Sequence, residues 1–148
     1  MNDDKERALK SALFLLKYRP RGRFELESAL KRKGFDADTI ELTLQKLEGF
    51  GYINDSDFAR LFVNSRISRG WGVRRIAAAL KRLNIVEDIY RSFLPSSADM
   101  RKQLRELAVR KAKFYQGKKN AKQKLIRFLA ARGFDFEDIL QVLEKVEC

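Results

Sequence analysis

The chain has 148 residues and a formal net charge of +12; 45% of its residues are hydrophobic and 35% are charged. This composition is too apolar for a disordered chain and too charged for a membrane protein, and no apolar run reaches the roughly 18 residues of a transmembrane helix. The charged N-terminus lacks the apolar stretch of a signal peptide, so we expect a cytoplasmic protein.

Composition also excludes most catalytic chemistry. The sequence contains no histidine, and Cys148 is its only cysteine. The usual zinc sites, Ser-His and Cys-His nucleophile pairs and histidine acid–base catalysis all need these residue types. Two acidic pairs leave a Mg²⁺ site open, namely Glu25 with Glu27 and Asp55 with Asp57. Because both pairs stand beside expected helix starts, we interpret them as caps and helix-dipole partners, and we expect no metal, no cofactor and no catalysis.

One block of sequence occurs three times. Residues 26–35, LESALKRKGF, recur as residues 76–85, IAAALKRLNI, and as residues 125–134, LIRFLAARGF, at offsets of 50 and 49 residues. A basic residue stands seven positions before each block: Arg19, Arg69 and Lys118. Self-similarity at a nearly fixed period predicts tandem structural repeats.

The first repeat, residues 1–53, predicts three helices. Its first helix carries apolar residues at i, i+3 and i+4 spacing: Leu9, Ala12, Leu13 and Leu16. The second helix lies in the recurring block, and the third carries Ile40, Leu44 and Leu47. Between these two helices, Gly34 suits a left-handed C-cap and Asp36 suits an N-cap.

The second repeat, residues 54–95, follows the same plan. Asn54 or Asp55 caps a first helix, and Asn84 takes the place of Gly34 because asparagine tolerates the left-handed conformation. The apolar positions of its helices are Phe58, Leu61 and Phe62, then Val73, Ile76, Ala77 and Leu80, then Ile89 and Phe93.

The third repeat, residues 96–148, follows Pro95 and is capped by Ser96 or Ser97. Gly133 and Asp135 repeat the turn of the first repeat. The apolar positions are Leu104, Leu107 and Ala108, then Leu125, Phe128 and Leu129, then Ile139, Leu140, Leu143 and Val146. No segment alternates with the period of a strand.

We therefore expect an all-α fold of three tandem three-helix units, each similar to a helix-turn-helix module. A unit of about 45 residues has a marginal core of its own. Stacking lets neighbours share apolar surface and produces an elongated, curved array. The alternative is one compact domain of nine helices.

The positive charge is concentrated in the second helices. Residues 22–33, 72–83 and 118–132 carry net charges of +2, +4 and +6, whereas residues 37–48 and 136–146 in the third helices each carry −2. A helix-turn-helix module places its last helix in the DNA major groove, where acidic residues would face phosphates. Base reading by the third helices is therefore disfavoured, and the basic second helices are the expected polyanion-binding surface.

The densest arginine cluster surrounds Gly70-Trp71-Gly72, which opens the second helix of the second repeat. Its members are Arg66, Arg69, Arg74 and Arg75. Arginine makes bidentate contacts with phosphate or carboxylate, so we expect a partner-binding site here. The surface is extended by other basic residues: Arg19, Lys81, Arg82, Lys118, Lys119, Lys122, Lys124 and Arg127. We interpret Phe114 and Tyr115 as closing a helix end against a core, with stacking on nucleic-acid bases as the alternative.

The motif Gly51-Tyr52-Ile53-Asn54-Asp55-x-x-Phe58-Ala59, followed by Arg66-x-x-x-Gly70-x-Gly72-x-x-Arg75-Ile76, resembles the signature of the RecX family, regulators of the RecA recombinase. The resemblance covers nearly the whole chain. It implies three tandem three-helix repeats and binding along the groove of the RecA–DNA filament, with lower ATP hydrolysis, strand exchange and coprotease activity. We interpret six motif residues as mainly structural: Asp55, Phe58, Gly70, Trp71, Gly72 and Ile76.

Two functional hypotheses remain. The first is a non-catalytic, monomeric inhibitor of RecA, which involves no membrane and no small-molecule substrate. The second is a helical protein that binds single- or double-stranded DNA directly. Strong DNA affinity without a partner would favour the second hypothesis.

Overall fold

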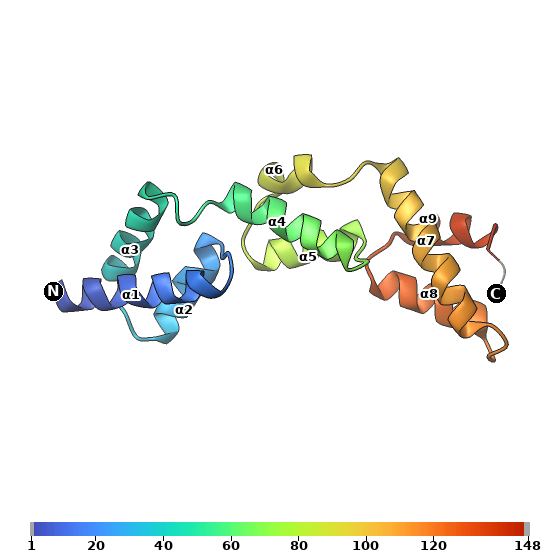
Figure 1. Cartoon of the computed structure of the whole chain (residues 1–148), viewed down its shortest axis with the longest axis horizontal. Coiled ribbons are helices and arrows are strands. Elements are labelled where there is room, and N and C mark those ends of the chain that lie inside the picture. Colours follow the sequence, from blue (N-terminus) through green and yellow to red (C-terminus); the bar gives the residue numbers. More distant parts are fainter. Residues whose placement is uncertain (1, 147–148) are drawn as a thin grey trace.

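A computed structural model describes residues 2–146 and contains helices but no strands over that range. The first unit holds α1 (Asn2–Tyr18), α2 (Arg23–Arg32) and α3 (Ala37–Gly49). The second holds α4 (Asp55–Ser68), α5 (Val73–Arg82), α6 (Glu87–Tyr90) and the 3₁₀ turn η1 (Arg91–Phe93). The third holds α7 (Ser97–Tyr115), α8 (Ala121–Ala131) and α9 (Phe136–Leu143). The units follow one another along an arched molecule (Figure 1), which confirms the tandem array and rules out the compact alternative.

Each unit has its own hydrophobic core, and the recurring block supplies the same two positions to all three. The pairs Leu26 and Leu30, Ile76 and Leu80, and Leu125 and Leu129 have no exposed surface. These pairs lie four residues apart on one face of α2, α5 and α8, where they pack against the other helices of their unit. The sequence repeat is therefore a repeat of core positions.

Three apolar residues predicted to lie on core faces are instead exposed. Leu13 is 37% exposed, Leu61 45% and Leu140 38%. Each lies at the edge of its helix's apolar stripe, and a helix in a three-helix unit packs against only two neighbours. A small unit therefore buries a narrower stripe than the spacing of apolar residues predicts.

The predicted turns are confirmed in detail, with one correction. Gly34, Asn84 and Gly133 all adopt positive φ, at 91°, 60° and 98°. Three side chains accept a capping bond from the backbone N–H three residues later: Asp36, Asn54 and Ser96. Asp135 stands at the N-cap of α9 but makes no such bond. Its carboxylate lies 3.7 Å from the Arg74 guanidinium across the junction of the second and third units, which explains the difference.

The third helix of the second unit is shorter than predicted. α6 ends at Tyr90, and the chain continues as the 3₁₀ turn that brings Phe93 onto the second core. Val86 occupies the N-cap of α6 and has no side-chain acceptor for the free backbone N–H groups. A weakly capped start and the nearby Pro95 limit this helix to about one turn.

The second and third units meet through backbone atoms. The Gly72 N–H donates to the Arg132 carbonyl at 2.6 Å, and the Arg74 N–H donates to the Gly133 carbonyl at 3.0 Å. A Cβ on Gly72 would lie 2.4 Å from the carbonyl carbon and oxygen of Gly133. Glycine at position 72 is therefore required by the close approach of two chain segments.

The first and second units meet at the equivalent place, but through side chains. Gly22, the counterpart of Gly72, lies against the side chains of Asp55, Phe58 and Ile85. The Arg23 N–H donates to the Asp55 carboxylate at 3.0 Å. In both junctions, the start of a second helix contacts the turn before the next unit's third helix, through Gly133 in one and Ile85 in the other. The hydrogen bond at the first junction goes instead to the start of α4.

We predict that Gly72→Ala lowers the free energy of unfolding by at least about 2 kcal/mol, because the methyl group separates two backbones that exchange hydrogen bonds. Urea denaturation followed by the fluorescence of Trp71, the only tryptophan, measures the change. Gly49→Ala is the matched control, since a Cβ at Gly49 meets nothing within 4 Å and its φ is not positive. Equal midpoints for the Gly72→Ala variant and the wild type would contradict the packing described here.

Candidate polyanion-binding face

The turn between α4 and α5 places an indole ring beneath two guanidinium groups. Gly70 has φ 83°, and the backbone N–H of Trp71 donates to the Arg66 carbonyl at 3.0 Å. The left-handed glycine therefore returns the chain over the end of α4. Trp71 packs against the second core and contacts the edge of Phe62, with ring centroids 6.4 Å apart. The Arg75 Cζ lies 3.8 Å from the Trp71 centroid. The Arg66 Cζ lies 5.2 Å from the Trp71 centroid and 4.2 Å from that of Phe62.

Arg66 is the most constrained of these cations. Its side chain is partly buried, and its buried Nε has no hydrogen-bond partner among the residues that the structure describes. Burial lowers the pKa of Arg66, and the positive charges of Arg69, Arg19 and Arg75 lower it further. Arg66 and Arg75 share the Trp71 ring, and the charges of Arg69 and Arg19 also act on Arg66, although Arg19 belongs to the first unit. We call Arg19, Arg66, Arg69 and Arg75 the central arginine cluster.

The four arginines predicted around this turn do not all lie together. Arg74 points to the third unit, where it pairs with Asp135 at 3.7 Å while its side chain remains 72% exposed. The Arg69 carbonyl accepts a hydrogen bond at 2.8 Å from Nη1 of Arg132. Arg132 was not among the candidate residues, because nothing in the sequence links it to a residue 63 positions earlier. Arg19 was a candidate, but its closeness to Arg66 had no signal in the sequence.

Carboxylates pair with several cations of the first unit but with fewer of those in the other two. Arg23 pairs with Glu41 at 2.7 Å and with Glu48 at 2.6 Å, and its hydrogen bond lowers the pKa of Glu41. Arg19 pairs with Glu25. By contrast, the other candidate cations make no ion pair within residues 2–146: Lys81, Arg82, Lys118, Lys119, Lys122, Lys124 and Arg127. All seven side chains are exposed. Most of the uncompensated positive charge of the second helices therefore lies on the second and third units.

The basic run 118–124 is divided between a turn and a helix. Lys118 and Lys119 lie in the connection after α7, and Asn120, with φ 57°, starts α8. Tyr115 is half-buried against the third core, as expected of a residue that closes a helix end. The same interpretation is wrong for Phe114, which is 58% exposed, because the last turn of α7 directs adjacent residues to different faces.

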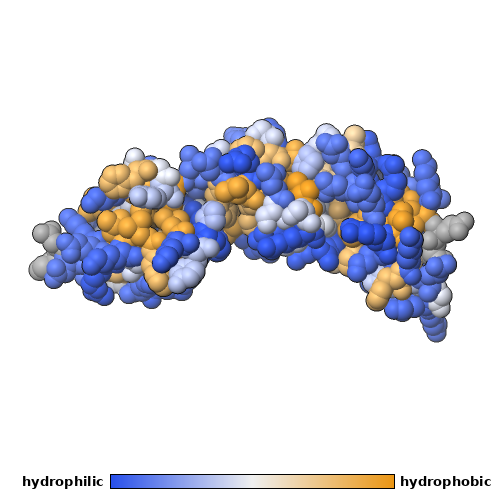
Figure 2. Space-filling view, in the orientation of Figure 1, coloured by the Kyte–Doolittle hydropathy of each residue, from blue (hydrophilic) through white to orange (hydrophobic). Residues whose placement is uncertain are grey.

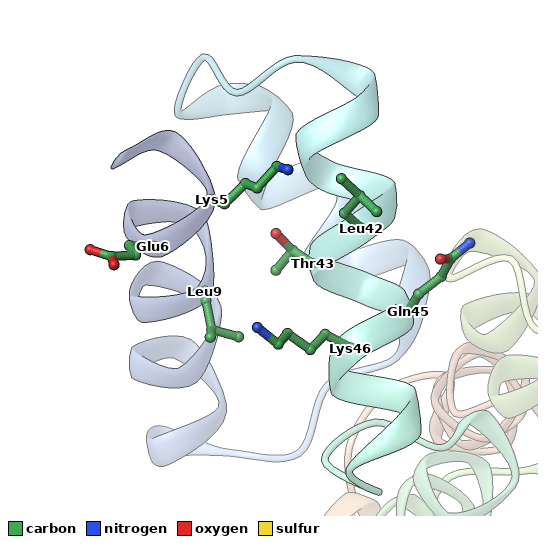
Figure 3. A pocket seen from close by; sticks show the side chains of 7 residues that line it. All are labelled: Lys5, Glu6, Leu9, Leu42, Thr43, Gln45 and Lys46. Carbon is green, nitrogen blue, oxygen red and sulfur yellow. The ribbon is translucent and has the colours of Figure 1, made fainter. Parts of the chain in front are cut away.

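The first unit has a different surface. Figure 2 shows a large apolar patch over this end of the molecule. A groove between α1 and α3 is lined by Leu9 and Leu42 together with Lys5, Glu6, Thr43, Gln45 and Lys46 (Figure 3). Thr43 in this groove donates its hydroxyl to the Thr39 carbonyl at 2.8 Å. The groove therefore has the character of a contact surface.

Two further features concern the part of the chain that the structure describes. It holds no group of three or more Asp, Glu, His or Cys side chains arranged to bind a metal ion. None of its helices is long and apolar enough to cross a membrane.

The three units correspond, in order, to domains of a known protein family. Residues 8–47, 54–92 and 99–143 match, in order, the first, second and third three-helix domains of RecX. The chain belongs to the RecX family. All residues of the central arginine cluster fall within or beside these matched domains.

Members of the RecX family align over almost the whole chain. The regulatory protein RecX of Prosthecochloris aestuarii is 31% identical and covers 98% of this chain and 97% of its own length. That of Chlorobaculum tepidum is 35% identical and covers 96% and 89%. The crystal structure of RecX from Lactobacillus salivarius superposes with a TM-score of 0.82 at 24% identity, over 99% of this chain and 98% of that one. This superposition supports the fold.

We predict that Arg75→Gln lowers the free energy of unfolding by about 0.5–1 kcal/mol and changes the emission of Trp71, because the variant removes the cation over the indole. Urea denaturation and an emission spectrum measure both effects. Arg82→Gln is the control, since Arg82 is an exposed arginine of the same helix that lies over no aromatic ring in the described chain. An unchanged spectrum for Arg75→Gln would show that the guanidinium does not rest on Trp71.

Proposed function

We propose that the protein is a non-catalytic regulator of the RecA recombinase, which it inhibits by binding the RecA–DNA filament. On this proposal it lowers ATP hydrolysis, strand exchange and coprotease activity, and it acts as a monomer in the cytoplasm without a cofactor. Membership of the RecX family supports regulation of RecA in general terms. The central arginine cluster is the observation that carries filament binding.

The cluster suits an anionic partner for an electrostatic reason. Arg66, Arg69 and Arg75 make no ion pair within residues 2–146, yet each carries a full positive charge near the others. Like charges at short range repel, and an anion between them relieves that repulsion. Trp71 and Phe62 hold Arg66 and Arg75 in place, so less side-chain entropy is lost when they bind.

The shape of the molecule suits a repetitive partner. Candidate cations extend from Arg19 at the end of α1 to Arg127 on α8, across all three units of the arched array (Figure 1). A filament presents the same surface at regular intervals. Several weak contacts on one connected body then combine into a strong interaction, because each later contact forms within a single complex.

Direct DNA binding is the second candidate, and the free cations of α8 favour it. The third helices do not, because α9 begins with Glu137 and Asp138 and α3 begins with Asp38. Contact with DNA would therefore run along the second helices and follow the phosphates without reading bases.

The deciding experiment titrates the protein into RecA hydrolysing ATP on single-stranded DNA at near-physiological salt, alongside DNA binding by the protein alone. We expect inhibition at concentrations below those that bind free DNA. Inhibition only where the protein already covers the DNA, and its loss with added salt, would favour direct DNA binding.

We predict that the double variant Arg69→Glu, Arg75→Glu raises the concentration for half-inhibition of RecA by at least about tenfold, since two attractive contacts become repulsive. Arg66 is kept because its side chain is partly buried and packs on both Phe62 and Trp71, whereas Arg69 and Arg75 are exposed. The ATPase titration measures the shift.

The matched control is Arg60→Glu, Arg101→Glu, which makes the same charge change at two exposed arginines outside the candidate surface. Arg60 is exposed and lies 3.9 Å from Asp57. Equal shifts for both double variants would mean that net charge alone governs inhibition and would remove the special role of the cluster.

A further inference from the structure

The aromatic ring of Phe114 is exposed at the end of the third unit. It lies in the last turn of α7 with 58% of its surface exposed, and its edge-to-face contact with Tyr115, at a centroid distance of 5.1 Å, holds it against a half-buried neighbour. Exposing a phenyl ring to water is unfavourable, and Phe114 is not part of the third core. The groups around Phe114 indicate which kind of ligand its ring suits.

Two ammonium groups lie over this ring. Nζ of Lys118 is 3.9 Å from the Phe114 centroid, and Nζ of Lys111 is 5.3 Å from it. Lys111 also lies 4.6 Å from the centroid of Phe128 on α8, so it bridges the two helices of the hairpin. The hairpin tip thus combines a largely exposed aromatic ring with two ammonium groups close to it.

The sequence on both sides of Phe114 carries only positive charges. Between Leu107 and Phe134 the sequence contains no acidic residue. The cations of this stretch are Arg110, Lys111, Lys113, Lys118, Lys119, Lys122, Lys124, Arg127 and Arg132. None of them forms an ion pair within residues 2–146. The α7–α8 hairpin therefore carries its positive charge uncompensated.

Phe114 differs in this respect from the other exposed aromatic side chains of residues 2–146. These are Phe14, Tyr18, Phe24, Phe50, Tyr52 and Phe136. None of these six has a lysine or arginine over its ring in the described part of the chain. Exposure alone therefore does not distinguish Phe114, but the two lysines over its exposed ring do.

We propose that the tip of the α7–α8 hairpin binds single-stranded nucleic acid, with Phe114 as the platform for one base and Lys111, Lys118 and their neighbours as the phosphate contacts. Stacking and phosphate binding together are what sequence-tolerant single-strand sites use. A duplex would engage only the cations, because its base faces are already covered by stacking. An acidic peptide has no aromatic base to occupy the ring.

The site is separate from the central arginine cluster and needs no RecA. Lys111 and Phe114 lie on α7 of the third unit, whereas Arg66, Arg69 and Arg75 lie around the α4–α5 turn of the second. Failure of the site would leave the proposed inhibition of RecA intact, and failure of RecA inhibition would leave the site intact.

The test measures fluorescence anisotropy of a labelled oligo(dT) of about 15 nucleotides, which spans one site of this class, with the full-length protein alone. We predict that Phe114→Ala weakens binding roughly five- to hundredfold, the range expected for one stacked base, while Phe114→Trp retains it. Lys118→Gln lowers the dependence of log K on log salt by about 0.7, the value for one phosphate on a single strand.

Phe14→Ala is the matched control, because it removes an exposed phenyl ring without an overlying cation. A duplex of equal length should bind more weakly and lose no affinity with Phe114→Ala, and oligo(U) distinguishes RNA from DNA as the favoured strand. The proposal is overturned if the wild type does not bind oligo(dT) at low salt. It is also overturned if Phe114→Ala binds like the wild type, or if Phe14→Ala causes the same loss.

Discussion

The close approach of Gly72 to Gly133 determines how the second and third units sit together. Two backbone hydrogen bonds cross this contact, and neither glycine has room for a side chain there. The same contact brings Arg132 to the Arg69 carbonyl and Asp135 to Arg74. The orientation of the basic third unit relative to the central arginine cluster therefore depends on two glycines. The arrangement of the charged side chains thus relies on two residues that have no side chain.

Trp71 connects the hydrophobic core to the charged surface. Trp71 packs against the second core and makes an edge-to-face contact with Phe62. The guanidinium groups of Arg66 and Arg75 lie over its indole ring. Such cation–π contacts add modest stability, but they restrict flexible side chains that would otherwise move freely in water. The α4–α5 turn thus presents cations in a defined arrangement, as the proposed recognition of a regular anionic surface requires.

The three units share a fold but differ in how far carboxylates pair with their cations. In the first unit, Arg23 forms ion pairs with Glu41 and Glu48, which compensate its positive charge. In the third unit, α8 has no such partners, and its hairpin with α7 also exposes Phe114. One repeated scaffold therefore offers an apolar groove at one end, an arginine cluster at the centre and a basic, aromatic tip at the other end.

The sequence by itself determined the helices, their turns, the threefold repeat and the placement of charge on the second helices. These features depend on residues a few positions apart: leucines spaced by four, a glycine or asparagine after each second helix, and a capping oxygen at Asp36, Asn54 or Ser96. Only the tertiary structure decided that Arg19 joins Arg66, that Arg132 reaches a carbonyl 63 residues away, and that Phe114 is exposed while Tyr115 is not. Such contacts depend on the angles between packed helices, and those angles follow from the summed shapes of many side chains, which no short sequence pattern specifies.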